Sequence, residues 1–534
     1  HNTSTQFTET TVSDNAGNTI ETLRALSATQ DGASQEYTFA TFTYNDLDQL
    51  ITKNELDYIR QSSPKTPPAP DITQTTIYEW NAYGEILSVQ NPDGSKELYT
   101  YDTHSKDGYQ TSIAITYYPG KSKTITYYNN NNQPCLQETY ATLIDKAPDT
   151  VQKFTYDHFM RQRTQALSGR ETFTYEYDAF DRIVVKNGTS SGRQTLVYAS
   201  HSAAPLVVTL AVDDIVIGER TYDGLDRETS STINSVQTQY SYAGTAIFSR
   251  PSLVSITGGR QWKYEYNAAL NQTTKKSILS STSVPMAVLT FDYAPDSGLL
   301  QKETITQRGY TYSRTFLYDT FNHIKEESAF WDSDALGKYK TSITNSIRGK
   351  PIELSVKFNN DTTTISKKSV YSNTGFITDI SYSLSDKRSS NKILSFSRIH
   401  RSASTGNTTR IDNYARTIYN NFRLTTQSID YNSYNLKKSI SYHLFSHPVF
   451  GCEMKYNRHH QLEIAHYNFS ARNAYQWSEH YKYNDRGTLA SWERHGNTTY
   501  QNEYGDTVLK QSFTLDRLGN ISSINSEFKD GHCT

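Results

Sequence analysis

Histidine side chains gather late in the chain, and their number there could support metal binding or a response to pH. The cluster consists of His443, His447, His459, His460, His466 and His480. Imidazoles hold a transition metal when several converge, and they change charge between pH 5 and 8. Only His443 and His447 have the i, i+4 spacing of helical ligands, and their stretch has strand character with Pro448 directly after it. We therefore expect no metal site and keep a pH switch as the alternative.

The conspicuous carboxylates stand where the chain turns. They are Asp178, Asp181, Asp223, Asp226 and Asp319, and each follows a tyrosine by one or four positions. Hydrolysis of a polysaccharide needs two carboxylates that face one groove, and these positions nominate no such pair. The chain also has no Gly-x-Ser-x-Gly, phosphate-loop or dinucleotide-binding motif. We expect a protein that is not an enzyme and that holds neither a cofactor nor a metal.

The cysteines offer no site. Cys135, Cys452 and Cys533 are far apart, odd in number and in no metal-binding spacing. Three unpaired thiols are the simplest interpretation.

One stretch shows which elements hold the turn carboxylates. In residues 172–188, Phe173, Tyr175 and Tyr177 alternate with polar residues, which is the period of a strand with three rings on one face. Asp178 follows, where a short carboxylate can accept a bond from the backbone N–H two residues on. The β-branched residues 183–185 resume the sheet. The stretch therefore predicts strand, tight turn and strand.

The same turn recurs along the chain with a restricted fourth position. Counted from the leading aromatic, that position holds Asp48, Gly84, Asn132, Asp181, Asp226, Asn322, Gly375, Asn435, Gly487 or Gly519 in ten copies. Asp, Asn and Gly tolerate positive φ best, so we expect a left-handed backbone there. The residue after the aromatic is Asp or Asn in nine copies, with Ser372 as the exception. Met160 after Tyr156 and the late Gly298 after Tyr293 break the pattern and predict longer or bulged turns.

The spacing of the copies predicts a repeat array. Leading aromatics fall at 101, 128, 156 and 177, at 266, 293 and 318, and at 431, 456 and 483. A period of this size is the signature of stacked units that cannot bury their faces alone. Stacked hairpins form a continuous sheet, and the right-handed twist of strands rolls that sheet into a spiral. The fold class we expect is all-β.

Composition agrees with a wide sheet that meets water. The 534 residues include 41 Tyr and 21 Phe, hydrophobic residues make up only 35%, and the mean hydropathy is -0.70. A net charge of -2 gives no reason to expect nucleic acid as a partner. No apolar run approaches the ~18 residues that span a bilayer, so we expect no direct membrane insertion.

Tyr-Asp-x-x-Gly/Asp-Arg units at this spacing resemble the YD repeats of the RHS family. The stretch 218–229, followed by Tyr240-Ser241-Tyr242 and Arg250-Pro251, is similar to the B component of bacterial ABC-type (Tc) insecticidal toxin complexes. The resemblance covers residues 40 to 525. It implies a single-layer sheet that curls into a hollow shell, or cocoon, around an unfolded toxic polypeptide.

The resemblance also implies partners and a location. A C component would carry the toxic C-terminal polypeptide, a pore-forming A component would receive it, and the protein would be secreted. Shells of this family carry a self-cleaving aspartyl site marked by Asp-Pro-x-Gly, which this chain lacks. Asn91-Pro92-Asp93-Gly94 and residues 295–299 are only faint echoes. The chain is therefore expected to be shell wall without the protease, and we see no signature of the propeller that a B component normally has.

Segment by segment, we expect an edge segment or join over 1–36, the repeat shell over 37–525 and a polar tail over 526–534. Residues 62–72 hold four prolines and predict a surface loop. Residues 201–217 predict an apolar strand buried on both faces or covered by a neighbour, and 331–350 a short helix or insertion. Because the chain begins with His1 rather than Met, we expect a piece of a longer polypeptide.

Three other functions remain as alternatives. The first is a cell-surface adhesion or glycan-binding shell, as in teneurin-like proteins, which would need a recognition domain. The second is an RHS polymorphic toxin shell used in bacterial competition. The third is a polysaccharide-cleaving enzyme with an aromatic cleft. Rows of rings can bind sugars, but cross-strand ladders that hold the sheet explain them better.

Overall fold

The computed structural model describes residues 7–26, 35–59, 69–106, 109–243, 250–267, 269–331, 337–358, 363–386, 389–416, 421–469, 475–496, 500–501, 507–516 and 520–528. Over these residues the protein is all-β, with 41 strands in one antiparallel sheet and no helix. The predicted fold class is therefore confirmed in its all-β, single-sheet character. No helix in the described part of the chain is long and apolar enough to cross a membrane.

The strands follow one another closely along the chain. The first half comprises β1 (Phe7–Ser13), β2 (Thr19–Leu26), β3 (Gln35–Tyr44), β4 (Leu50–Asp57), β5 (Ile72–Trp80), β6 (Ile86–Gln90), β7 (Lys96–Lys106), β8 (Tyr109–Tyr117), β9 (Lys123–Tyr128), β10 (Pro134–Tyr140), β11 (Thr150–Tyr156), β12 (Gln162–Leu167), β13 (Thr172–Tyr177), β14 (Ile183–Gly188), β15 (Gly192–Tyr198), β16 (Val207–Val212), β17 (Ile215–Tyr222), β18 (Glu228–Ile233), β19 (Val236–Ser241) and β20 (Leu253–Ile256). The second half comprises β21 (Gln261–Asn267), β22 (Gln272–Leu279), β23 (Pro285–Tyr293), β24 (Leu300–Gln307), β25 (Tyr310–Tyr318), β26 (Ile324–Trp331), β27 (Lys338–Asn345), β28 (Pro351–Phe358), β29 (Thr364–Tyr371), β30 (Ile377–Asp386), β31 (Ser389–Arg401), β32 (Thr408–Arg416), β33 (Asn421–Tyr431), β34 (Lys437–Leu444), β35 (His447–Tyr456), β36 (Leu462–Phe469), β37 (Tyr475–Tyr483), β38 (Leu489–Gly496), β39 (Tyr500–Gln501), β40 (Thr507–Leu515) and β41 (Ile521–Phe528).

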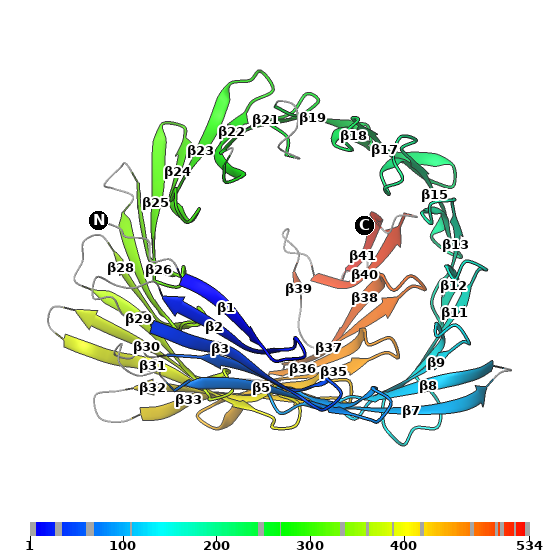
Figure 1. Ribbon diagram of the computed structural model, residues 1–534, viewed down its shortest axis with the longest axis horizontal. Helices are drawn as coiled ribbons and strands as arrows, with labels where there is room; N and C mark the ends of the chain where they lie inside the picture. The colour runs from blue at the N-terminus through cyan, green and yellow to red at the C-terminus, as the bar shows by residue number, and fades with distance from the viewer. Residues whose placement is uncertain are drawn as a thin grey trace. The chain divides into compact units, whose positions relative to one another are not determined.

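The chain divides into two compact units. Unit 1 comprises residues 1–78, 218–398 and 414–422, and unit 2 comprises residues 79–217, 399–413 and 423–534. Within each unit a strand pairs antiparallel with the strand that precedes it, as β22, β23 and β24 do in unit 1 and β35, β36 and β37 do in unit 2 (Figure 1). The described part of 1–36 follows the same rule, because β1 pairs with β2 and β2 with β3.

This up-and-down order gives the sheet two different edges. Strand direction alternates, so the links from odd to even strands gather at one edge and the links from even to odd strands at the other. From β1 to β38 the predicted turns are all odd-to-even links, for example those after β11 and β13. We call this the turn edge, and the opposite one the loop edge.

The turns have the backbone that the sequence predicts. Positive φ is found at Asp48 (58°), Gly84 (82°), Asn132 (59°), Asp181 (61°), Asp226 (61°), Asn322 (65°), Gly375 (81°), Asn435 (59°) and Gly487 (82°). Gly519 lies outside the described residues. In the turn after β13, the Asp178 N–H donates to the Arg182 carbonyl and the Asp181 N–H to the Asp178 carbonyl. The register shifts by one residue beside Tyr177, so each turn is a tight turn closed by a bulge.

Of the two predicted irregular turns, the one at Met160 is bulged, but no more so than its sister turns, and the one after Tyr293 is longer, while the turn expected after Tyr101 is absent. Met160 adopts the same positive φ (64°) and the same bonds as its sisters, because this turn imposes a left-handed residue whatever its type. Tyr101 does not precede a turn, since β7 continues past it to Lys106. The turn after Tyr293 is one residue longer, with the Ala294 N–H bonded to the Leu299 carbonyl.

The segment predictions met mixed outcomes. Residues 338–350 form β27 and a tight turn rather than a helix, while residues 332–336 and most of the proline-rich stretch, residues 60–68, lie outside the described residues. Residues 201–217 are not one buried strand. Only Ala211 and Val212 of β16 are buried, and Ile215 and Val216 of β17 are exposed beyond a two-residue turn.

The sheet has much surface for its mass. The solvent-accessible surface area of the protein is 32015 Å², whereas that of a compact monomer of 60.8 kDa is roughly 20,000 Å². Across the described residues, more large hydrophobic side chains are exposed than buried. A sheet one layer thick accounts for both observations. The one cluster of buried hydrophobic residues described, in unit 1, is formed by Tyr37, Phe39, Tyr58, Phe321 and Ile347.

Candidate functional site

The tyrosine of each repeat ties one turn to the turn before it. Its hydroxyl donates to a backbone carbonyl at or near the start of the preceding even-numbered strand, as Tyr177 does to Gln162 at 2.7 Å. The same bond is made by Tyr44, Tyr101, Tyr156, Tyr198, Tyr242, Tyr266, Tyr293, Tyr318, Tyr371, Tyr431, Tyr456 and Tyr483. Tyrosine suits this position better than phenylalanine, because its ring can pack while its hydroxyl donates.

The residue after the tyrosine holds the turn together. Asp178 accepts bonds from the Phe180 N–H (2.9 Å) and the Arg182 N–H (3.0 Å), and its second oxygen accepts from Arg182 Nε at 2.7 Å. Burial raises the pKa of Asp178, but the backbone and side-chain hydrogen bonds from Arg182 outweigh it and hold the pKa below its usual value. The carboxylate thus replaces the water that the turn backbone would otherwise bind.

The identity of this capping residue matches the residue four positions later. Asp pairs with a cation, as in Asp157–Arg161, Asp178–Arg182 and Asp223–Arg227. Asn instead donates its amide to Gln or Glu, as in Asn45–Gln49, Asn81–Glu85, Asn129–Gln133 and Asn457–Gln461. This pairing of residue types four positions apart can be seen in the sequence, but we did not predict it.

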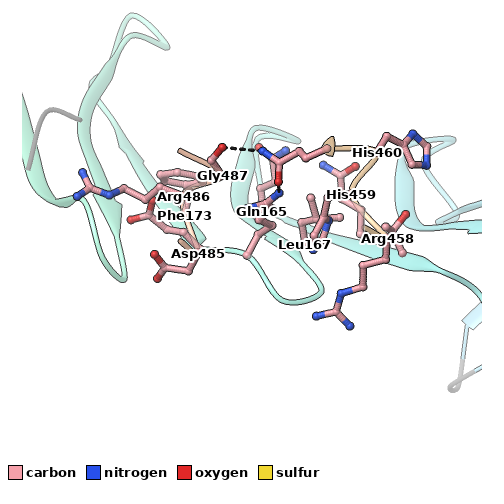
Figure 2. Close-up of a pocket in the computed structure, with 14 residues that line it drawn as sticks. Gln165, Leu167, Phe173, Arg458, His459, His460, Asp485, Arg486 and Gly487 are labelled. Atoms are coloured by element: carbon pink, nitrogen blue, oxygen red, sulfur yellow. Dashed lines mark hydrogen bonds between the residues drawn. The ribbon is translucent and has the colours of Figure 1, made fainter. Parts of the chain in front are cut away.

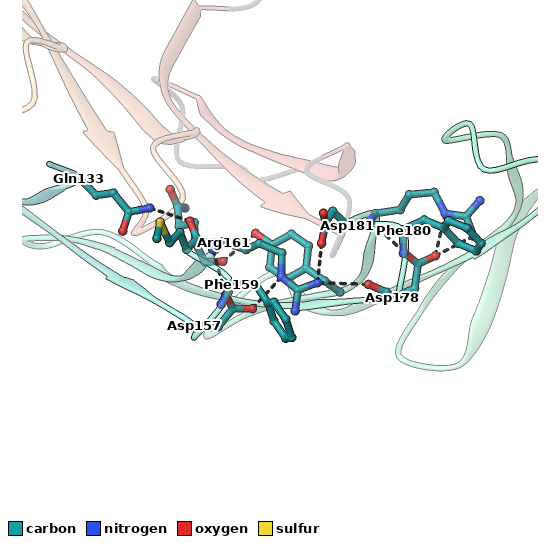
Figure 3. Close-up of polar contacts among 11 residues, drawn as sticks. Gln133, Asp157, Phe159, Arg161, Asp178, Phe180 and Asp181 are labelled. Carbon is teal, nitrogen blue, oxygen red and sulfur yellow. Dashed lines mark hydrogen bonds and ion pairs between the residues drawn. The ribbon is translucent and has the colours of Figure 1, made fainter. Parts of the chain in front are cut away.

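Arginine links adjacent turns along the turn edge. Arg161 bonds the Asp178 carbonyl (3.2 Å) and the Asp181 carboxylate (2.8 Å) of the next turn, and its guanidinium lies 4.7 Å from the Tyr177 ring centroid. Figure 3 shows this chain of contacts running from one turn to its neighbour. Each turn is therefore held by its own cap and by the turns on both sides.

In unit 1 a second kind of contact joins segments that are far apart in the sequence. The turn after β27 meets the end of β4, where Asp57 accepts from the Ser346 hydroxyl (2.8 Å) and the Arg348 N–H (3.0 Å). Asp57 is 1% exposed. The Thr73 N–H donates to the Asn373 carbonyl at 2.7 Å. We call such docking of a turn onto the loop edge a seam.

Unit 2 contains a seam of the same construction. The Glu171 N–H donates to the Asp485 carbonyl at 3.1 Å, and Arg170 reaches the Asn484 carbonyl at 2.8 Å and the Gln461 side chain. The Tyr434 hydroxyl donates to Asp149 at 2.5 Å. The hydrogen-bonded partners at the two seams are 276 to 314 residues apart in sequence. In each unit a turn thus docks on the loop edge of a segment about 300 residues earlier in the chain.

A cavity of about 530 Å³ lies at the unit 2 seam. Gln165, Leu167 and Phe173 line it from β12 and β13, and the turns after β35 and β37 line it with His459 and Asp485 (Figure 2). Gln461 links the two docked turns, because its amide donates to the Gly487 carbonyl at 2.6 Å. The cavity mixes charges of both signs with an apolar wall.

The structure separates the histidine cluster. His459 and His460 lie at the unit 2 seam, His443 and His447 at the hairpin between β34 and β35, and His466 and His480 on neighbouring strands β36 and β37. His480 also approaches His495, with ring centroids 4.9 Å apart. No group of three or more His, Cys, Asp or Glu in the described ranges is placed to hold a metal. Cys135 and Cys452 are free thiols, and Cys533 lies beyond the described residues.

The seam histidines are set up to respond to pH. Burial and then the charges of Arg170 and Arg458 lower the pKa of His459, and neither of its ring nitrogens has a partner among the residues described. Burial also lowers the pKa of His460, which packs on the Tyr434 ring at 4.0 Å, although Asp149 opposes the shift. Both side chains therefore favour the docked turn when they are neutral.

The unit 2 seam is expected to weaken as the pH falls below about 6.5, the usual histidine pKa. As the pH falls, a histidine of the undocked turn is protonated before the same histidine of the docked turn. Docking therefore weakens until the pH falls below the lower pKa of the docked histidine. For His459 the docking equilibrium changes by up to about tenfold per pH unit. Hydrogen exchange at the Glu171 amide, referred to strand amides of β13, measures this between pH 7.5 and 5.5. His459→Phe should reduce the dependence, and an unchanged ratio in the parent chain would contradict it.

Comparison with known proteins places the fold. No protein-family model and no curated protein sequence matches the chain. The crystal structure of TcdB2-TccC3-Cdc42 aligns over 99% of this chain with a TM-score of 0.54 and 11% sequence identity. TcdB2-TccC3 without its hypervariable C-terminal region aligns over 99% with a TM-score of 0.40 and 11% identity. The chain spans 30% of the length of each. At this identity the likeness concerns the fold, a shell-like β-sheet.

Proposed function

We propose that this chain is wall of a shell that encloses an unfolded toxic polypeptide and shields it before delivery through a translocation pore. The observation that carries the proposal is the seam, which appears in both units between partners 276 to 314 residues apart in sequence. A sheet one layer thick that docks its turn edge onto its own loop edge forms a wall without a packed core. The likeness in fold to a TcdB2-TccC3 complex supports the same role.

The proposal includes partners and a location. A C component of the TccC type would supply the enclosed polypeptide, a pore-forming A component would accept it, and the assembly would be secreted. The role asks for no catalysis by this chain and for no cofactor. Its ring rows serve the sheet itself, as shown by Tyr467 stacked on Trp477 at 4.8 Å across β36 and β37, which favours the wall over a glycan-binding surface.

Protection of the cargo from protease tests this function. The full-length polypeptide that contains this sequence is co-expressed with its cargo-bearing C component, and the purified complex is treated with a nonspecific protease. We expect the cargo to be cleaved at least roughly 100 times more slowly than the same cargo made alone, because a folded sheet must open before the protease enters. Cargo that is digested equally fast in both preparations would refute the proposal.

A further inference from the structure

The residue three positions after each leading aromatic stands at the tip of its turn, and we call it the knob. Where a turn docks at a seam, the knob is covered: Phe321 is 4% exposed in unit 1, and Tyr434 is half-buried in unit 2. At five other turns the knob is a large hydrophobic residue in the open. The exposed knobs are Leu47 (64%), Tyr83 (90%), Phe159 (74%), Phe180 (61%) and Leu225 (59%).

The docked knobs show what such a side chain binds. The Phe321 ring packs edge-on to Tyr37, with centroids 5.6 Å apart, and 6.4 Å from Phe39. Tyr434 instead reaches a carboxylate, that of Asp149. In both cases the receiving surface is the loop edge of the same kind of sheet, where strand ends present rings, carboxylates and backbone carbonyls. A knob on the turn edge is therefore complementary to a loop edge.

Phe159 and Phe180 form the best-defined free pair, because they stand on the adjacent turns after β11 and β13 of unit 2 (Figure 3). Each ring has a guanidinium beside it, with Arg161 at 4.9 Å from Phe159 and Arg182 at 5.0 Å from Phe180. Both guanidiniums are already paired with carboxylates of the turn edge, so the exposed rings are what this row offers to a loop edge. Neither ring lies on a face of the sheet, so neither belongs to a surface that would line an enclosed space.

We propose that the Phe159–Phe180 row is an interaction surface for the loop edge of another YD-repeat sheet, carried by a partner chain. The inference rests on the proposed function, since it takes that partner to be the C component, and it adds the surface by which the two chains join. The seams within this chain are the precedent: the same turn position docks on the same kind of edge wherever one is available. A second copy of this chain and an unrelated protein are the competing occupants.

A binding measurement with matched variants tests the surface. The probe is the purified C component, titrated against the full-length polypeptide that contains this sequence. The double variant Phe159→Asp/Phe180→Asp should bind roughly tenfold or more weakly, because buried aromatic anchors dominate interface energies. Ile215→Asp is the control, since Ile215 is 67% exposed at the start of β17, on the opposite, loop edge of the sheet. Equal affinity of the double variant and the parent would overturn the proposal.

Photo-crosslinking identifies what covers the rings. Phe159 or Phe180 is replaced by a benzoylphenylalanine in the assembled complex, and the adducts are mapped by mass spectrometry. Adducts to even-to-odd strand links of the C component support the proposal. Adducts to a second copy of this chain or to another protein overturn it. If the parent polypeptide fails to bind the C component at all, the proposed function fails as well, whereas a complex that leaves both rings free removes only this surface.

Discussion

Phe321→Ala is expected to lower the free energy of unfolding of unit 1 by about 3–5 kcal/mol, the usual cost of removing a buried phenylalanine ring. Phe321 is 4% exposed, and its ring packs against Tyr37 and Phe39. The substitution leaves a cavity in the buried hydrophobic cluster of that unit. Because this cluster joins two segments nearly 300 residues apart, neighbouring turns cannot close the gap. A shift of the urea unfolding midpoint, followed by circular dichroism, measures the loss.

The matched control is Phe180→Ala, which removes the same ring from the same position of another turn. Phe180 is 61% exposed and contacts Arg182, so its loss should cost less than about 1 kcal/mol. The difference between the two variants isolates docking from the turn itself. Similar midpoints for both variants would show that Phe321 is not buried by a docked turn.

The repeated turn could be predicted from the sequence because its requirements are local. A left-handed residue at Asp181 or Asn322 is a property of one backbone position, and only a few residue types tolerate it. The cap by Asp178 spans four residues. Pattern and chemistry therefore coincide within a few positions, and the all-β array followed from their repetition. Met160 shows the limit, since the fold imposed the same backbone on an unfavourable residue.

The seams could not be predicted, because nothing local marks them. Asp57 and Ser346 meet across 289 positions, and Arg170 meets Asn484 across 314. Which turn docks on which loop depends on twist and strand length summed over many intervening strands. Serine, aspartate and arginine occur at seams and at ordinary turns alike. The knob position is a partial exception, because its hydrophobic residues occupy a turn tip where polar residues are the norm.

The dispersal of the late histidines over the fold has the same cause. His459 and His460 stand at a turn that docks, whereas His466 and His480 lie on strands of the sheet. These histidines are close in sequence, but a residue in a docked turn and a residue in the following strands have different neighbours in the fold. The pH switch that the sequence left open therefore reduces to the two residues at the unit 2 seam.

Asp57→Ala is the second large effect, with an expected loss of about 3–5 kcal/mol from the stability of unit 1. The Asp57 carboxylate accepts from the Tyr58 N–H at 2.8 Å, the Arg348 N–H at 3.0 Å and the Ser346 hydroxyl at 2.8 Å, and Lys350 Nζ lies 3.9 Å away. Alanine leaves these donors buried and unpaired, and it removes the only charge that faces the lysine at that distance among the described residues. Removing one partner from a buried set of hydrogen bonds and charges costs more stability than the complete set contributes.

Asp57→Asn separates the charge from the hydrogen bonds. The amide oxygen can keep the bonds from the Tyr58 and Arg348 N–H groups, and the Ser346 hydroxyl can rotate to accept from the new amide. We therefore expect a loss near 1 kcal/mol and a seam that still forms, seen as slow hydrogen exchange at the Ile347 amide, which bonds the Tyr58 carbonyl. Alanine should speed that exchange strongly. If alanine and asparagine behave alike, the carboxylate does not hold the seam, and docking would then rest on the ring cluster around Phe321 alone.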